Sequence, residues 1–119
     1  MTILGTARIS TTDPDRLNIT IKSADPAGRV LAPTWDMVMA SKSGEITWEQ
    51  YTNQYLALLR GRYAQNKQPF LDILTRDRVI LTCYCTDHTQ CHRWLAMQVL
   101  QKIAVLHDIT ITLLGELDS

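Results

Sequence analysis

The sequence predicts an α/β fold with a small mixed or mostly parallel sheet, flanked by helices and ending in a right-handed βαβ unit. Two observations predict it. Short runs rich in Ile, Val and Thr are separated by longer segments with helical periodicity. The C-terminal third has the order apolar strand, apolar helix, strand, which is typical of parallel strands joined by a crossover helix. We expect one domain, residues 1–119.

The first two predicted strands are residues 2–10 and 16–22, on either side of the turn-rich segment 11–15. We expect a hairpin or a looped strand pair here. In the second run, Leu17, Ile19 and Ile21 alternate with polar residues. One face of that strand is therefore predicted to be buried, and its polar face is available to line a site.

Three helices are predicted next. Residues 35–42 carry Trp35, Val38 and Met39 at helical spacing, and Gly44 supplies a C-terminal stop. The longest helix should begin after Thr47, which forms a capping box with Gln50. Pro69 then begins a short helix, because proline is well placed in a first helical turn.

The C-terminal βαβ unit comprises residues 79–85, 91–106 and 109–114. The first run is apolar and β-rich throughout, as in a strand covered on both faces, so it should lie mid-sheet. The helix is apolar around most of its circumference and should be largely buried. A polar turn at 86–90 joins the two.

Composition restricts the function. Twelve basic and twelve acidic side chains cancel, which argues against non-specific nucleic-acid binding. No apolar run is long enough to span a bilayer, and the start does not resemble a signal peptide, so we expect a cytoplasmic protein without membrane contact. The three cysteines lie within residues 83–91 and cannot form a disulfide framework across the chain. The protein should fold alone or as a homo-oligomer.

The turn after the predicted mid-sheet strand carries the candidate chemistry. Ligands of open α/β sheets bind at the carboxyl ends of parallel strands, where Cys83 and Cys85 are placed. Cys91, His92 and Arg93 begin the following helix, whose free N–H groups favour an anion or a thiolate. The guanidinium of Arg93 suits a phosphate or carboxylate. The simplest functional interpretation is an anion-binding pocket.

Three alternatives compete with that interpretation. Cys91 could be a catalytic thiolate with Arg93 as anion stabiliser, although no oriented base is evident. Zinc could be bound by Cys83, Cys85, His88 and Cys91, but the paired Cys-x2-Cys spacing of a strong zinc motif is absent. The third alternative is structural: buried cysteines are ordinary core residues, and Arg93 could pair with Asp87 or Asp72.

Other motifs add little. Zincin, P-loop, dinucleotide and zinc-deaminase signatures are absent, so no cofactor or metal is predicted. Trp48, Tyr51 and Tyr55 repeat at helical spacing and are expected in the core rather than as a stacking platform.

The whole chain resembles the bacterial and phage family called domain of unknown function 488. The residues that carry the resemblance are Leu17-Asn18-Ile19-Thr20, Lys22-Ser23, Leu31-Ala32-Pro33-Thr34, the segment from Lys42 through Gly44, Ile46, Trp48 and Tyr51 to Tyr55, Cys83-Tyr84-Cys85 and Cys91-His92-Arg93. Many members carry a carboxylate where this chain has Cys85, which argues against a strict thiolate cage. The resemblance implies a compact α/β fold and a shared polar site that combines Lys22-Ser23, Ala32-Pro33, Lys42 and the Cys-His-Arg turn.

Together these observations predict a pocket for a small anionic or nucleotide-like ligand. Its predicted walls and contacts are Lys22, Ser23, Pro33, Lys42, Cys83, Cys85, Cys91, His92 and Arg93. Whether the protein turns its ligand over or only binds it stays open at this point.

Overall fold

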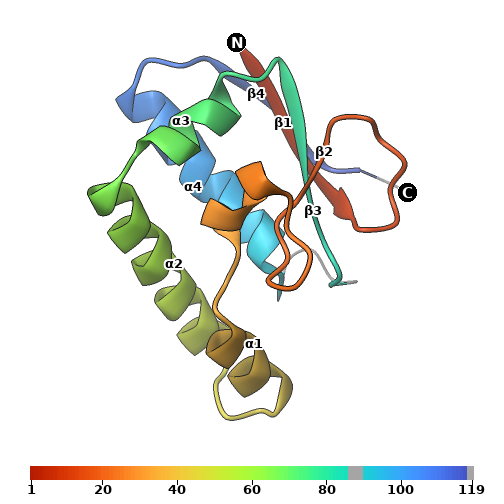
Figure 1. Ribbon diagram of the computed structural model, residues 1–119, viewed down its shortest axis with the longest axis vertical. Coiled ribbons are helices and arrows are strands. Elements are labelled where there is room, and N and C mark those ends of the chain that lie inside the picture. The colour runs from red at the N-terminus through yellow and green to blue at the C-terminus, as the bar shows by residue number, and fades with distance from the viewer. Residues whose placement is uncertain (86–89, 118–119) are drawn as a thin grey trace.

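The computed structural model describes residues 1–85 and 90–117. Its described strands form one sheet: β1 (Thr2–Arg8), β2 (Arg16–Asn18), β3 (Arg78–Cys83) and β4 (Ile111–Glu116). The strand order is β2-β3-β1-β4, and every pairing among these strands is parallel. The predicted α/β class is therefore confirmed, with helices gathered beside the sheet in Figure 1.

The helical segments follow the predicted start and stop signals. They are the 3₁₀ helix η1 (Pro26–Leu31), α1 (Trp35–Lys42), α2 (Trp48–Gln65), α3 (Gln68–Leu74) and α4 (His92–Leu106). Thr34 caps α1, and Thr47 forms the predicted capping box with Gln50 at the start of α2. Gly44 adopts a positive φ of 80°, as a helix stop requires.

The predicted hairpin of the first two strands is wrong. β3 lies between β1 and β2, and residues 9–15 lead from the carboxyl end of β1 back to the amino end of β2, which runs parallel to it. Arg78 at the start of β3 holds this loop through Asp13 and Asp15, with nitrogen–oxygen distances of 2.6 and 3.0 Å. The second strand also ends at Asn18 instead of residue 22, because the Asn18 side chain accepts the Thr20 N–H and turns the chain.

β3 is the interior strand that the sequence predicted, and its residues from Val79 to Cys83 are buried. The predicted βαβ unit is formed by β3, α4 and β4, with β1 lying between its two strands. Since all the strands are parallel, their carboxyl ends share one edge of the sheet. That edge is where β3 leads toward the start of α4.

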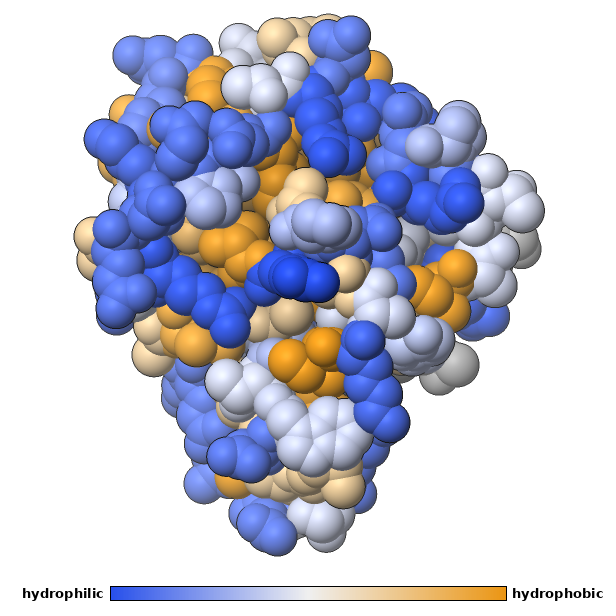
Figure 2. Space-filling model, viewed as in Figure 1, coloured by the Kyte–Doolittle hydropathy of each residue, from blue (hydrophilic) through white to orange (hydrophobic). Residues whose placement is uncertain are grey.

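The apolar core lies between the sheet and the helices, with α4 contributing the most buried residues of any described helix. In α1, Met37 is buried, whereas Trp35 and Met39 are about 45% exposed. On the face shown in Figure 2, hydrophobic side chains appear as separate patches among hydrophilic ones. None of the described helices is long and apolar enough to cross a membrane.

Candidate functional site

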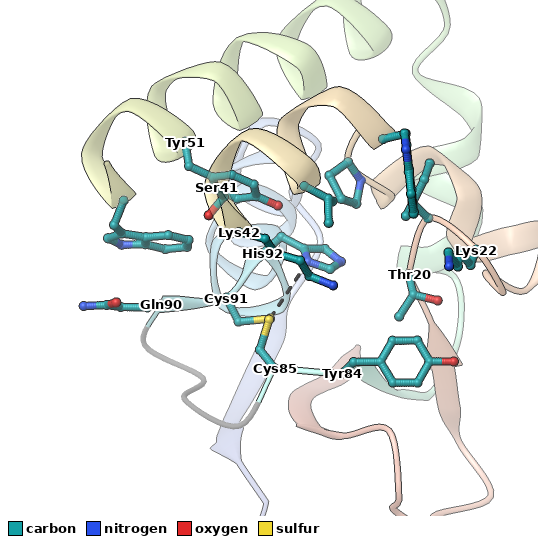
Figure 3. Close-up of a pocket in the computed structure, with 15 residues that line it drawn as sticks. Thr20, Lys22, Ser41, Lys42, Tyr51, Tyr84, Cys85, Gln90, Cys91 and His92 are labelled. Atoms are coloured by element: carbon teal, nitrogen blue, oxygen red, sulfur yellow. Dashed lines mark hydrogen bonds between the residues drawn. The ribbon is translucent and has the colours of Figure 1, made fainter. Parts of the chain in front are cut away.

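A cavity of about 420 Å³ lies where the β2 end, the β3 end and the start of α4 meet α1 and α2. This is the position at which ligands of parallel α/β sheets bind. Figure 3 shows Thr20, Lys22 and Tyr84 on one side of it and Cys85, Cys91 and Gln90 on another. Its lining residues are Thr20, Ile21, Lys22, Pro33, Trp35, Val38, Ser41, Lys42, Trp48, Tyr51, Tyr84, Cys85, Gln90, Cys91 and His92.

The wall after β2 is built by a turn whose side chains bond one another. The Thr20 hydroxyl donates to the side-chain oxygen Oδ1 of Asn18 at 2.8 Å. The Ser23 hydroxyl lies 2.9 Å from the Thr20 hydroxyl. The Ser23 hydroxyl is also 3.1 Å from the Tyr84 hydroxyl. Gly28 of η1 packs against this turn so closely that a Cβ at position 28 would clash with the backbone carbonyl oxygen of Asn18. Ser23 therefore positions Tyr84 without lining the cavity itself.

Two lysines and several aromatic rings give the cavity its chemical character. The Lys22 ammonium lies 4.8 Å from the centre of the Trp35 ring, a cation–π contact. Lys42 projects from the last turn of α1. Trp48 and Tyr51 are stacked, with ring centres 5.2 Å apart and planes 16° apart. Burial, with a smaller effect of nearby Cys85, raises the pKa of Tyr51 well above its ordinary value, so its hydroxyl stays protonated.

His92 presents a defined tautomer next to Cys91. Its Nε2 lies 2.8 Å from the Ile19 carbonyl oxygen, which can only accept, so Nε2 carries the hydrogen. Nδ1 then has the lone pair, and it lies 3.9 Å from the Cys91 Sγ (Figure 3). Burial lowers the pKa of His92 to about 4; the Ile19 hydrogen bond opposes this shift and the Arg93 charge adds to it. His92 is therefore neutral at pH 7.

Arg93 is fully buried and lies outside the cavity. Its Nε and Nη2 donate to the two carboxylate oxygens of Glu116 at 3.1 and 2.7 Å. Its Nη1 donates to the Cys83 Sγ at 3.1 Å and to the Cys85 carbonyl oxygen at 2.8 Å. The guanidinium thus ties the end of β3 to β4, and a direct contact from Arg93 to a ligand in the cavity is not supported. Its partner is Glu116 and not Asp72, while Asp87 lies outside the described residues.

The three cysteine sulfurs converge beside Arg93, all within 4.8 Å of one another. The Sγ atoms of Cys83 and Cys91 are in contact. The Cα atoms of that pair are 7.8 Å apart, whereas disulfides usually span about 4.4–6.8 Å. Of the three neighbouring cysteines, Cys85 and Cys91 border the cavity.

The structure divides the predicted site residues into two groups. Lys22, Pro33, Lys42, Cys85, Cys91 and His92 line the cavity. Ser23, Cys83 and Arg93 lie behind its walls and hold them in place. His88, the fourth predicted zinc ligand, lies outside the described residues.

Sequence reasoning missed most of the aromatic wall. Of the stripe expected in the core, Tyr55 is fully buried as predicted, but Trp48 and Tyr51 also face the cavity. Trp35 and Tyr84 were not predicted as cavity residues. Their exposure was the missing signal, because an aromatic side chain in an amphipathic pattern is normally assigned to the core.

Comparison with known proteins gives one family match. The family model described as DUF488-N3a, the active DUF488-N3 subclade, matches residues 4–104, a range that includes every lining residue of the cavity. Searches of curated proteins and of solved structures find no significant match. The chain therefore belongs to the DUF488-N3a family, as the resemblance to the domain of unknown function 488 implied.

Proposed function

We propose that the cavity binds a small, anionic, nucleotide-like molecule. The observation that carries this proposal is the combination of Lys22 and Lys42 with stacked aromatic rings in one cavity. No acidic side chain is among the described residues that line it. A flat ring gains from stacking on aromatic faces, and a phosphate gains from the lysine charges.

The size and lining of the cavity support a small molecule. A volume of about 420 Å³ lies within the roughly 300–1,000 Å³ that is usual for ligand pockets. About half of the lining residues are aromatic or aliphatic, and polar side chains lie between them, as in pockets that orient a ligand by a few contacts. Because the chain has no net charge, the attraction for an anion has to be local.

Tryptophan fluorescence tests this proposal, since Trp35 and Trp48 both line the cavity. Inorganic phosphate, a nucleoside and the matching nucleoside monophosphate are titrated separately. We expect the monophosphate to bind more tightly than either fragment, because it meets both the lysines and the rings. Trp48→Ala should remove about 1–3 kcal/mol of its binding free energy. Equal, weak responses to all three probes would contradict the proposal.

A second candidate function is thiolate catalysis by Cys91. The geometry of His92 favours it: Nδ1 faces the Cys91 sulfur, while Ile19 fixes the ring from the other side. This is the order of nucleophile, base and orienting group that activated cysteines use. The description of the family as an active subclade supports it too. A cavity lysine, and not Arg93, would stabilise developing negative charge.

Cys91→Ser separates the two candidates. The protein and the variant are incubated with the nucleoside monophosphate that binds best, and products are followed by mass spectrometry. If Cys91 is the nucleophile, the variant should lose turnover while its affinity changes little. Turnover that persists in the variant would remove Cys91 from the chemistry.

A further inference from the structure

The cysteine cluster at the edge of the cavity has the composition of a soft-metal site. Cys83 is the last residue of β3, Cys85 follows two residues later, and Cys91 caps α4. The fold thus brings together sulfurs from a strand end and a helix start, within 4.8 Å of one another. Thiolate sulfur is a preferred ligand of zinc.

The Cα atoms of Cys83 and Cys91 lie farther apart than a disulfide usually spans, although their sulfurs are in contact, so a metal ion between them requires the reduced sulfurs to move apart. A disulfide joins two cysteines through one bond of about 2.05 Å, whereas a zinc ion joins them through two bonds of about 2.3 Å. The longer link suits the 7.8 Å between the Cα atoms of Cys83 and Cys91. A disulfide would use only Cys83 and Cys91, whereas a metal ion can bind the nearby Cys85 sulfur as well.

The electrostatic surroundings favour the deprotonated sulfur that a metal requires. The Arg93 Nη1 donates to the Cys83 Sγ at 3.1 Å, and a neighbouring guanidinium lowers the cost of a thiolate. Cys91 lies at the N-terminal end of α4, where the helix dipole favours negative charge. Glu116 balances the charge of Arg93, so the cation is held in place whether or not a metal is bound.

We propose that Cys83, Cys85 and Cys91 bind one zinc ion as three thiolate ligands, with its fourth position open toward the cavity. Three protein ligands with an exchangeable fourth position are typical of zinc sites that act on a bound molecule. Cys85 and Cys91 border the cavity, so a solute there can reach that position. The zinc site does not depend on the anion proposal. A zinc ion would hold Cys91 as a ligand, so thiolate catalysis would belong to the metal-free protein.

Metal binding is tested on untagged, fully reduced protein that has been freed of metal. Zinc is added in competition with a chromophoric chelator, and Co²⁺ serves as a spectroscopic probe. We expect one equivalent of zinc per chain, thiolate-to-cobalt charge-transfer absorption with the visible bands of tetrahedral cobalt, and protection of all three thiols from alkylation.

Cys85→Ser is the most informative variant, because Cys85 is exposed and its replacement leaves the core intact. It should weaken zinc binding at least tenfold and reduce the charge-transfer intensity. The matched control is Lys22→Ala with Lys42→Ala, which should weaken binding of the nucleoside monophosphate roughly tenfold and leave zinc binding unchanged. The zinc proposal and the anion proposal can therefore be contradicted separately. Reduced protein that takes up no zinc overturns the site. Zinc affinity unchanged in Cys85→Ser also overturns it.

Discussion

The start of α4 has two sides that differ sharply. On one side Arg93 is fully buried, and all its described donors end on Glu116, Cys83 or Cys85. On the other side Cys91 and His92 border a cavity with lysines at its wall. Consecutive residues of one motif therefore have different surroundings: Arg93 is enclosed in the fold, and Cys91 and His92 border the cavity.

Charge compensation is what distinguishes the two sides. The Arg93 guanidinium forms a bidentate pair with a carboxylate that Thr6 also contacts, at 2.7 Å. Within the described residues, neither Lys22 nor Lys42 makes an ion pair. A compensated charge stabilises the fold, whereas an uncompensated one in a cavity is available to a ligand. Substitutions on either side can test this difference.

The largest effect is expected from Arg93→Ala. Removing one partner of a buried ion pair leaves Glu116 uncompensated and typically costs about 3–5 kcal/mol of unfolding free energy. Urea denaturation followed by circular dichroism measures the loss. Adding Glu116→Gln to Arg93→Ala should restore part of the stability, because it removes the orphaned charge. An Arg93→Ala protein of normal stability that fails only to bind an anion would reverse the assignment of the two sides.

The cavity side should show the opposite behaviour. Lys22→Ala with Lys42→Ala should weaken binding of a nucleoside monophosphate by at least about 1.5 kcal/mol, roughly tenfold, through loss of charge-assisted contacts. The unfolding free energy should stay within about 0.5 kcal/mol of the parent. Fluorescence titration and urea denaturation give the two numbers. Lys102→Ala, an exposed lysine of α4 away from the cavity, is the matched control and should change neither.

A smaller effect on stability and binding is expected from Ser23, which does not line the cavity but contacts Tyr84, which does. Ser23→Ala removes the hydroxyl that lies 3.1 Å from the Tyr84 hydroxyl. Because this contact is exposed, we expect at most about 0.5–1 kcal/mol of unfolding free energy and a few-fold loss of ligand affinity. Tyr84→Phe breaks only the contact between the two hydroxyls, whereas Ser23→Ala also removes the contacts of Ser23 with Asn18 and Thr20, so Tyr84→Phe should cost no more than Ser23→Ala. A larger loss of affinity in Tyr84→Phe would mean that Tyr84 contacts the ligand through its own hydroxyl.

The smallest effect is expected from the ion pair of Arg78 with Asp13, at the end of β3 away from the cavity. This pair serves as a control for both the Arg93 and the lysine substitutions. The hydrogen bond from Arg78 lowers the pKa of Asp13 below its ordinary 3.8. The ion pair therefore stabilises the fold above about pH 4, and this contribution is lost as the pH falls through the lowered pKa. Thermal unfolding between pH 2 and pH 7 should show a shallower decline for Asp13→Asn. Ligand binding at pH 7 should be unchanged in this variant.

The sequence predicted the features that local chemistry fixes. Thr47 with Gln50, Gly44 and Pro69 marked helix ends, and the apolar, β-rich run of residues 79–85 marked the interior strand, which the structure ends at Cys83. The Cys-His-Arg turn after that strand also marked the edge of the sheet at which the cavity lies. Each of these signals depends on residues a few positions apart, so each can be recognised without knowing the fold.

The tertiary structure alone decided which distant residues meet. Glu116 reaches Arg93 only because β4 joins the sheet beside β1, and Trp35 and Trp48 face a cavity only because α1 and α2 pack where they do. Strand order and helix placement are set by the packing of the whole core, which no short segment encodes. The sequence by itself therefore determined where the motif begins a helix. The packed fold determined that Arg93 turns inward to a carboxylate while Cys91 and His92 turn toward the cavity.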